Sequence, residues 1–128
     1  MRAEIGIGTR MPMISCASGK FLQAHMTEEQ VDSLFPGEAL PPVTARSLGT
    51  KSELKALFPE IHGLGYALNE EEYAEGISGV ATGVADKNGT FIAALSVAGP
   101  ASRFRDEMWI GQLMEAAAKV AELLAGRL

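Results

Sequence analysis

Apolar residues recur at helical spacing in the first half of the chain and predict three helices there. The first covers 15–24, and the second begins at Thr27, which can form a capping box with Gln30. The third begins at about Ser52, and Pro59 lies inside its apolar pattern. Because proline lacks a backbone N–H and clashes with the preceding turn, we expect a kink or an early end at that position.

The second half of the chain predicts a β-hairpin. Two runs of β-prone residues, 77–85 and 90–98, flank residues 86–89. The loop contains Asn-Gly, and both residues tolerate positive φ, so the pair favours a tight turn between antiparallel strands. A short extended piece at 66–68 precedes the hairpin, after a glycine-containing turn.

A long helix is predicted at the end of the chain, from about Asp106 to Leu124. Its apolar residues form one stripe at helical spacing: Ile110, Leu113, Ala117, Val120 and Leu124. At the other end of the chain, Ile5 and Ile7 give a weak strand signal. This order of elements favours an α+β domain, an antiparallel sheet with helices packed on one side.

The hairpin strands predict one sheet face made mostly of small side chains. With 86–89 as the loop and Ala85 opposite Thr90, Gly79 pairs with Ser96, and Ala81 with Ala94. The small face then contains Ile77, Gly79, Ala81, Gly83, Ile92, Ala94, Ser96 and Ala98, and the other face contains Val80, Val84, Phe91, Leu95 and Val97. Such a face leaves room either for a ligand, with the Ser96 hydroxyl as a polar contact, or for a closely packed helix. The residues alone leave both interpretations open.

Composition narrows the class of protein. The 128 residues fit one domain covering 1–128, with 47% hydrophobic and 21% charged residues. No apolar run is long enough to span a membrane, and the single cysteine excludes an internal disulfide, so we expect a cytoplasmic domain. The net charge is −5 and the eleven Lys and Arg residues are scattered. Binding to nucleic acid requires a basic surface, so DNA binding by this chain alone is disfavoured.

The segment SCASGK at 15–20 is a candidate anion site, because it lies at the start of the first predicted helix. Unpaired backbone N–H groups and the helix dipole favour an anion there, and a carboxylate-bearing metabolite is the natural occupant. The same field could make the Cys16 thiolate reactive. The alternative is ordinary helix capping beside an inert, buried cysteine.

An enzyme is the less favoured interpretation. Nucleophilic catalysis by Ser18, Ser96 or Cys16 would need a histidine base. His25 lies toward the end of the first helix and His62 lies near a glycine turn, and neither position suits that role. A single cysteine and two separated histidines also form no metal-ligand pattern, so we expect no metal and no cofactor. The acidic run 70–72 is interpreted as a solvated loop.

Four blocks of the chain resemble the C-terminal effector-binding domain of IclR-family bacterial transcriptional regulators. They are IGTRMPM at 7–13 leading to ASGK at 17–20, TARS at 44–47, GYA at 65–67 with Glu71, Glu72 and Gly76, and AALSVAGPASR at 93–103. Together they span nearly the whole chain in the family's order. The resemblance implies a GAF-like fold, a six-stranded antiparallel sheet flanked by helices. It also implies a small-molecule effector, often a carboxylate or an aromatic acid.

The resemblance also implies effector contacts at Ala17, Ser18, Asn69, Gly79, Ser96 and Ala98. Three of these depart from the family's common residues, since Asn69 replaces an aspartate, Gly79 a cysteine and Ala98 a serine. Each change removes a charge or a polar side chain. We therefore expect an effector that is larger or less polar than a two- or three-carbon oxo acid.

Compared with the family, the chain is expected to begin partway into the effector domain, without its first strands. The winged helix-turn-helix that contacts DNA is then expected outside this chain. The remaining sheet should expose an unpaired edge, which favours pairing with another chain and hence a homodimer or homotetramer. The leading hypothesis is an effector-sensing and oligomerisation domain, and the alternative is a GAF-like enzyme or redox protein that uses Cys16.

Overall fold

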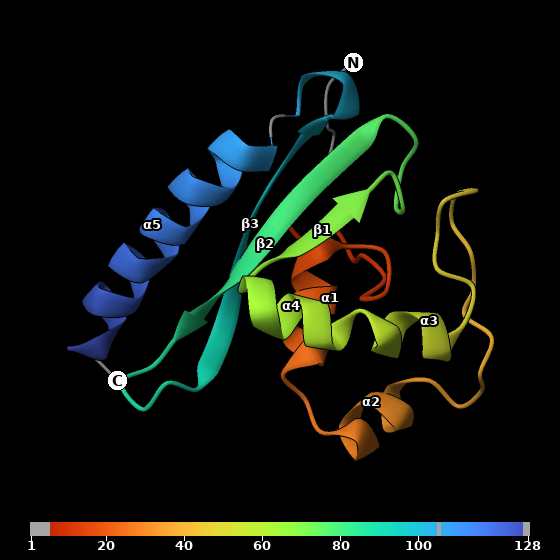
Figure 1. Cartoon of the computed structure of the whole chain (residues 1–128), viewed down its shortest axis with the longest axis horizontal. Coiled ribbons are helices and arrows are strands. Elements are labelled where there is room, and N and C mark those ends of the chain that lie inside the picture. Colours follow the sequence, from red (N-terminus) through yellow and green to blue (C-terminus); the bar gives the residue numbers. More distant parts are fainter. Residues whose placement is uncertain (1–5, 105, 127–128) are drawn as a thin grey trace.

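The structure is a computed structural model and describes residues 6–104 and 106–126. Its elements along the chain are α1 (Ala17–Ala24), α2 (Glu28–Leu34), α3 (Lys51–Ala56), α4 (Phe58–Leu64), β1 (Ala67–Glu70), β2 (Ile77–Ala85), β3 (Phe91–Pro100), the 3-10 helix η1 (Ala101–Arg103) and α5 (Asp106–Ala125). The described strands form an antiparallel sheet in the order β1-β2-β3 (Figure 1). The α+β class and the GAF-like arrangement of a sheet flanked by helices are therefore confirmed.

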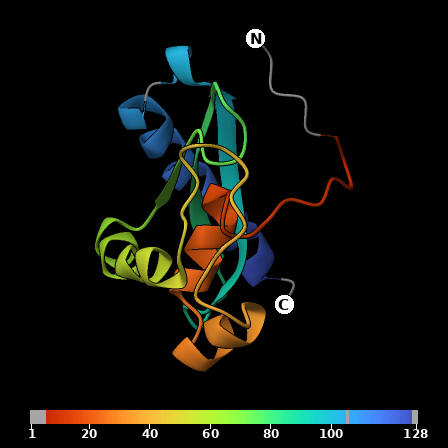
Figure 2. The same cartoon turned by 90° about the vertical axis from the view of Figure 1, so that its right-hand side faces the viewer.

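Helices cover both faces of the sheet, whereas the order of elements alone favoured one. Helices α1 to α4 lie on one side and α5 lies on the other (Figures 1 and 2). The central strand β2 explains why two layers are needed, because residues 79–82 are all buried and their side chains point alternately to the two faces. The predicted apolar stripe of α5 supplies one layer, with Leu113 and Ala117 buried.

The local signals for helix ends are confirmed. Thr27 and Gln30 form the predicted capping box at the start of α2. The helix expected from about Ser52 is interrupted at Leu57, which ends α3 and begins α4, and Pro59 lies in the first turn of α4. Gly65 ends α4 with a φ of 81°, a left-handed conformation that glycine adopts without strain.

Ile7, which was expected in a strand, instead lies in a turn and is fully exposed. A hydrogen bond of 3.2 Å from the Thr9 N–H to the Gly6 carbonyl closes that turn. Ile5, the other residue of that weak signal, lies outside the described residues. The predicted strand is therefore wrong at its second isoleucine.

The hairpin register differs from the predicted one by two residues. Gly79 lies opposite Ala98 and Ala81 lies opposite Ser96, with a β-bulge between Val84 and Ala85. A shift of two residues preserves which side chains share a face, so the small face keeps its predicted members on β2.

Phe91 is the exception to the predicted division of the two faces. Its ring meets that of Phe21 on α1 edge to face, with the centroids 5.0 Å apart, so it lies on the small face and not among the larger core residues. The bulge before the hairpin loop explains this change, because it inserts one extra residue between the paired positions.

Candidate functional site

The start of α1 has backbone donors without partners. Cys16 is the N-cap residue and its side chain makes no capping hydrogen bond to the helix. The first intrahelical bond runs from the Lys20 N–H to the Cys16 carbonyl, at 3.1 Å. Within the described part of the chain, the N–H groups of Ala17, Ser18 and Gly19 donate no hydrogen bond. Together with the helix dipole, they form a place where an anion would be stabilised.

Ser15 precedes this helix start and is 1% exposed. Its hydroxyl oxygen is buried and has no hydrogen-bond partner among the described residues. Its carbonyl accepts a hydrogen bond of 2.9 Å from the Asn69 side-chain N–H. The side-chain oxygen (Oδ1) of Asn69 in turn accepts a hydrogen bond of 2.9 Å from the Glu72 N–H. Asn69 therefore joins β1 to the residue in front of the N-cap.

Three of the six expected contact residues form one row across the sheet. Asn69 on β1 lies opposite Gly79 on β2, which lies opposite Ala98 on β3. Ser96 lies in the next row, opposite Ala81. A Cβ atom on Gly79 would lie 3.2 Å from the Val97 carbonyl oxygen, so this row has little space for a larger residue.

The structure places all six expected residues on the α1 side of the sheet, but their exposure differs. Ala17, Asn69 and Gly79 are buried, whereas Ser96 and Ala98 are exposed. Ser18 is half-buried, and its hydroxyl donates to the Cys16 sulfur at 3.8 Å. The buried members therefore lie near the start of α1, and the exposed ones lie on the outer strand β3.

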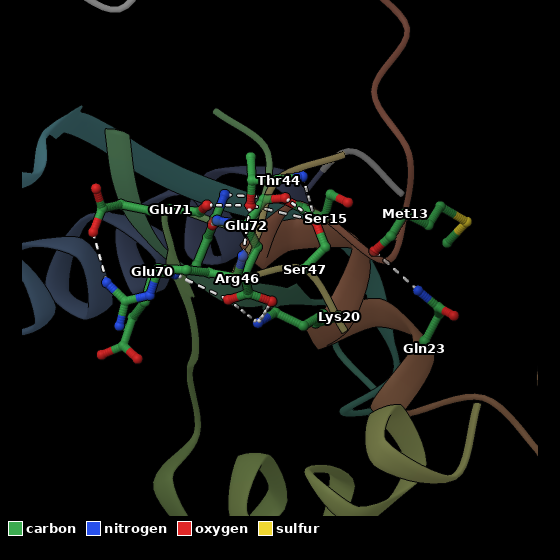
Figure 3. Close-up of polar contacts among 11 residues, drawn as sticks. Met13, Ser15, Lys20, Gln23, Thr44, Arg46, Ser47, Glu70, Glu71 and Glu72 are labelled. Atoms are coloured by element: carbon green, nitrogen blue, oxygen red, sulfur yellow. Dashed lines mark hydrogen bonds and ion pairs between the residues drawn. The ribbon is translucent and has the colours of Figure 1, made fainter. Parts of the chain in front are cut away.

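A buried ion pair lies one turn into α1 and was not expected from the sequence. The Lys20 ammonium is 2.8 Å from both carboxylate oxygens of Glu72, and the two side chains are only 4% and 9% exposed (Figure 3). The Glu70 N–H also donates to this carboxylate, at 3.0 Å. The interpretation of 70–72 as a solvated loop is therefore wrong for Glu72, which is buried and whose carboxylate pairs with Lys20 on α1.

Residues 44–47 form further hydrogen bonds to the segment that contains Glu71 and Glu72. The hydroxyl groups of Thr44 and Ser47 donate to the carbonyls of Glu71 and Glu72, each at 2.7 Å (Figure 3). The Gly76 N–H and then the Arg46 guanidinium hold the pKa of the Glu71 carboxyl below its usual range. Two blocks that are far apart in the sequence thus meet beside α1.

The two histidines are neighbours, although they are far apart in the sequence. The ring centroids of His25 and His62 are 4.7 Å apart, and each ring contacts a backbone carbonyl of α1. They lie at the end of α1, whereas Cys16 lies at its start, roughly 13 Å away along the helix. The structure therefore brings no imidazole to the thiol.

No helix in residues 6–104 and 106–126 is long and apolar enough to cross a membrane. Over the same ranges, no group of three or more His, Cys, Asp or Glu side chains is arranged to hold a metal ion.

Comparison with known proteins identifies the family. Residues 1–125 match the family model described as "Bacterial transcriptional regulator IclR C-terminal". The chain is 34% identical over 128 residues to the acetate operon repressor of Salmonella typhimurium, covering 98% of the chain and 47% of that repressor. The chain thus spans about half the length of the curated relatives it matches first.

Solved structures agree with this assignment. The C-terminal domain of the Escherichia coli regulator KdgR has a TM-score of 0.83 at 30% identity, covering 93% of this chain and 74% of that one. The inducer-binding domain of PobR from Acinetobacter, a double mutant in complex with 3-hydroxybenzoic acid, shares the fold with a TM-score of 0.80 at 22% identity, covering 94% and 69%. The chain therefore belongs to the IclR family of bacterial transcriptional regulators and corresponds to its C-terminal part.

Proposed function

We propose that this chain senses a small carboxylate-bearing metabolite, which binds at the start of α1 against the small face of the sheet. One observation carries the proposal. The N–H groups of Ala17, Ser18 and Gly19 donate no hydrogen bond within the described chain, and the adjacent Ser15 hydroxyl is buried without a partner. Buried polar groups normally find partners, and a carboxylate would satisfy several of these donors at once.

The six expected residues take different parts in this proposal. Ala17 and Ser18 offer backbone donors, Ser96 offers a hydroxyl, and Gly79 and Ala98 form an apolar floor. Asn69 forms part of the wall of the site, because its side-chain N–H and its side-chain oxygen already form hydrogen bonds to the protein. PobR in complex with 3-hydroxybenzoic acid supports the proposal at the level of the fold, since it is a domain of this fold that holds an aromatic acid.

Self-association is the second part of the proposal. Among the described residues, β3 pairs only with β2, and the sequence of β3 contains no charged side chain. An apolar edge without charged residues favours pairing with another chain, so we propose a homodimer or homotetramer. An effector that binds one subunit arrangement more tightly would shift the population toward it. DNA would be contacted through a separate winged helix-turn-helix domain.

Calorimetry with three acids tests the proposed selectivity. We expect 3-hydroxybenzoate to bind more tightly than glyoxylate or pyruvate, by about tenfold or more, because Gly79 and Ala98 lack polar side chains and Asn69 lacks the charge of the family's common aspartate. The variant Ala98→Ser, which adds one polar group without disturbing the contacts of Asn69 or the close packing at Gly79, should narrow that preference. Tight binding of glyoxylate or pyruvate by the unaltered chain, with no binding of the larger acid, would overturn the expected selectivity.

A second variant tests the position of the site. Ser96→Leu should abolish binding of the acid that binds best and leave the thermal midpoint without ligand unchanged, because Ser96 is exposed. Ser33→Leu, at an exposed position of α2, is the matched control and should bind normally. If Ser96→Leu bound with unaltered affinity, the pocket would lie elsewhere.

A further inference from the structure

A concave site lies between β1 and α4, and we call it the β1–α4 groove. It has a cavity volume of about 300 Å³, within the range of sites that hold small ligands or side chains. Its walls come from α4, from β1 and from the segment 46–48. None of the six residues expected to contact the effector lines it, so the proposed effector site does not account for it.

The outer edge of β1 faces this groove with unpaired backbone groups. In an antiparallel ladder, residues alternate between those whose N–H and C=O point to the partner strand and those whose groups point away. The Glu71 N–H points to β2, where it donates to the Ile77 carbonyl at 3.1 Å, whereas the Glu70 N–H points away, to the Glu72 carboxylate. Leu68 lies two residues before Glu70 in β1, so its backbone groups have the same orientation as those of Glu70. Its N–H and C=O therefore point outward, and neither has a partner within the described residues.

The wall opposite this edge is aliphatic. Leu57, Ile61 and Leu64 project from the start, middle and end of α4 at helical spacing, and all three line the groove. Ile61 is 5% exposed and belongs to the core, whereas Leu64 is 45% exposed. Leu48, in the loop before α3, adds to the same wall. An apolar side chain that entered here would cover Leu64 and gain contacts with the whole row.

The charges around the groove leave an excess of negative charge. The Lys20 ammonium is neutralised by Glu72, and Arg46 is paired with Glu71, at 2.6 Å. Glu60 on α4 and Glu70 on β1 also line the groove, and neither forms an ion pair within the described residues. Both are exposed. An occupant with positive charges would therefore be favoured over one with negative charges.

We propose that the β1–α4 groove binds an extended peptide segment of a partner protein in which basic and apolar residues alternate. The segment would add a strand to the outer edge of β1 and use the N–H and C=O of Leu68, a recognised mode of peptide binding. Successive side chains of a strand point to opposite sides. One set would meet the aliphatic wall of α4, and the other would place Lys or Arg near Glu70 on β1. Glu60, on the same helix as the wall, adds to the negative charge that favours a basic segment.

Fluorescence anisotropy with two labelled six-residue peptides tests this proposal. In one, lysine and leucine alternate, and in the other, glutamate and leucine alternate. We expect the lysine peptide to bind about tenfold more tightly and to move the backbone amide resonance of Leu68 in a ¹⁵N NMR titration. The variant Glu60→Gln with Glu70→Gln should weaken binding about fivefold. Glu115→Gln with Glu122→Gln, two exposed positions of α5, changes the charge equally and should have no effect.

Leu64→Ala gives an independent test of the aliphatic wall and should weaken the lysine peptide without altering the fold, because Leu64 is partly exposed. Equal affinities for the two peptides, an unmoved Leu68 amide, or no binding at about 1 mM would each overturn the proposal. These outcomes are separate from those of the acid titrations, because the groove shares no residue with the six proposed effector contacts.

Discussion

Replacing Lys20 by methionine is expected to lower the free energy of unfolding by about 3–5 kcal/mol. The reason is that the Glu72 carboxylate would stay buried without its cation. Methionine keeps most of the side-chain volume, so the loss would report the broken ion pair and not a cavity. In the native protein the ammonium is 2.8 Å from both carboxylate oxygens, and the two side chains are 4% and 9% exposed. Urea denaturation, followed by circular dichroism, measures the change.

Two further variants separate the ion pair from a general effect of losing a lysine. Lys20→Met combined with Glu72→Gln removes both charges and should recover most of the lost stability, because glutamine still accepts the hydrogen bond from the Glu70 N–H. Lys55→Met is the matched control, since Lys55 pairs with Glu28 and Asp32 at the surface. Its effect should be much smaller. A loss in Lys20→Met no greater than that in Lys55→Met would show that Lys20 and Glu72 are not a buried pair.

Sequence patterns predicted those parts of the fold that depend on neighbouring residues. The capping box of Thr27 and Gln30 and the break near Pro59 both follow from chemistry within one helical turn. The small face kept its predicted members on β2, because they depend on the alternation of side chains along one strand, whereas Phe91 of β3 joined that face. The predicted register was wrong by two residues. The hairpin loop is one residue longer than predicted, with Ala85 opposite Phe91, and the bulge between Val84 and Ala85 adds the second shift, which no residue pattern reveals.

Sequence patterns did not predict contacts between segments that are far apart along the chain. Glu72 is buried because Lys20, 52 positions earlier, lies beside it. His25 and His62 are neighbours because α4 packs against α1. As a set of six, the candidate contacts came from a resemblance to a family, although the residues alone had already indicated Ser96 on the small face and the start of the first helix. The structure adds two observations that the resemblance could not supply. The Ser15 hydroxyl has no partner among the described residues, and both the side-chain N–H and the side-chain oxygen of Asn69 form hydrogen bonds.

Gly19→Ala is expected to destabilise the protein by about 2–3 kcal/mol, although alanine is the better helix former. A Cβ atom at this position would lie 2.2 Å from the carbonyl oxygen of Met13 and 2.6 Å from its Cα. Both are backbone atoms, so the segment before α1 would have to move away from the helix. That movement would also pull Ser15 from Asn69 and open the start of α1.

Gly63→Ala is the matched control, because Gly63 also lies in a helix but, beyond its chain neighbours and its own helix backbone, no heavy atom of residues 6–104 and 106–126 lies within 4 Å of its Cβ position. At that position the higher helix propensity of alanine should determine the effect, and the variant should be more stable than the native protein by up to about 1 kcal/mol. The same substitution should therefore have opposite signs in α1 and α4, measured as free energies of unfolding in urea. A stabilising Gly19→Ala would mean that the chain does not cross α1 closely at Met13. The buried position of Ser15, and with it the proposed carboxylate site, would then lose its structural basis.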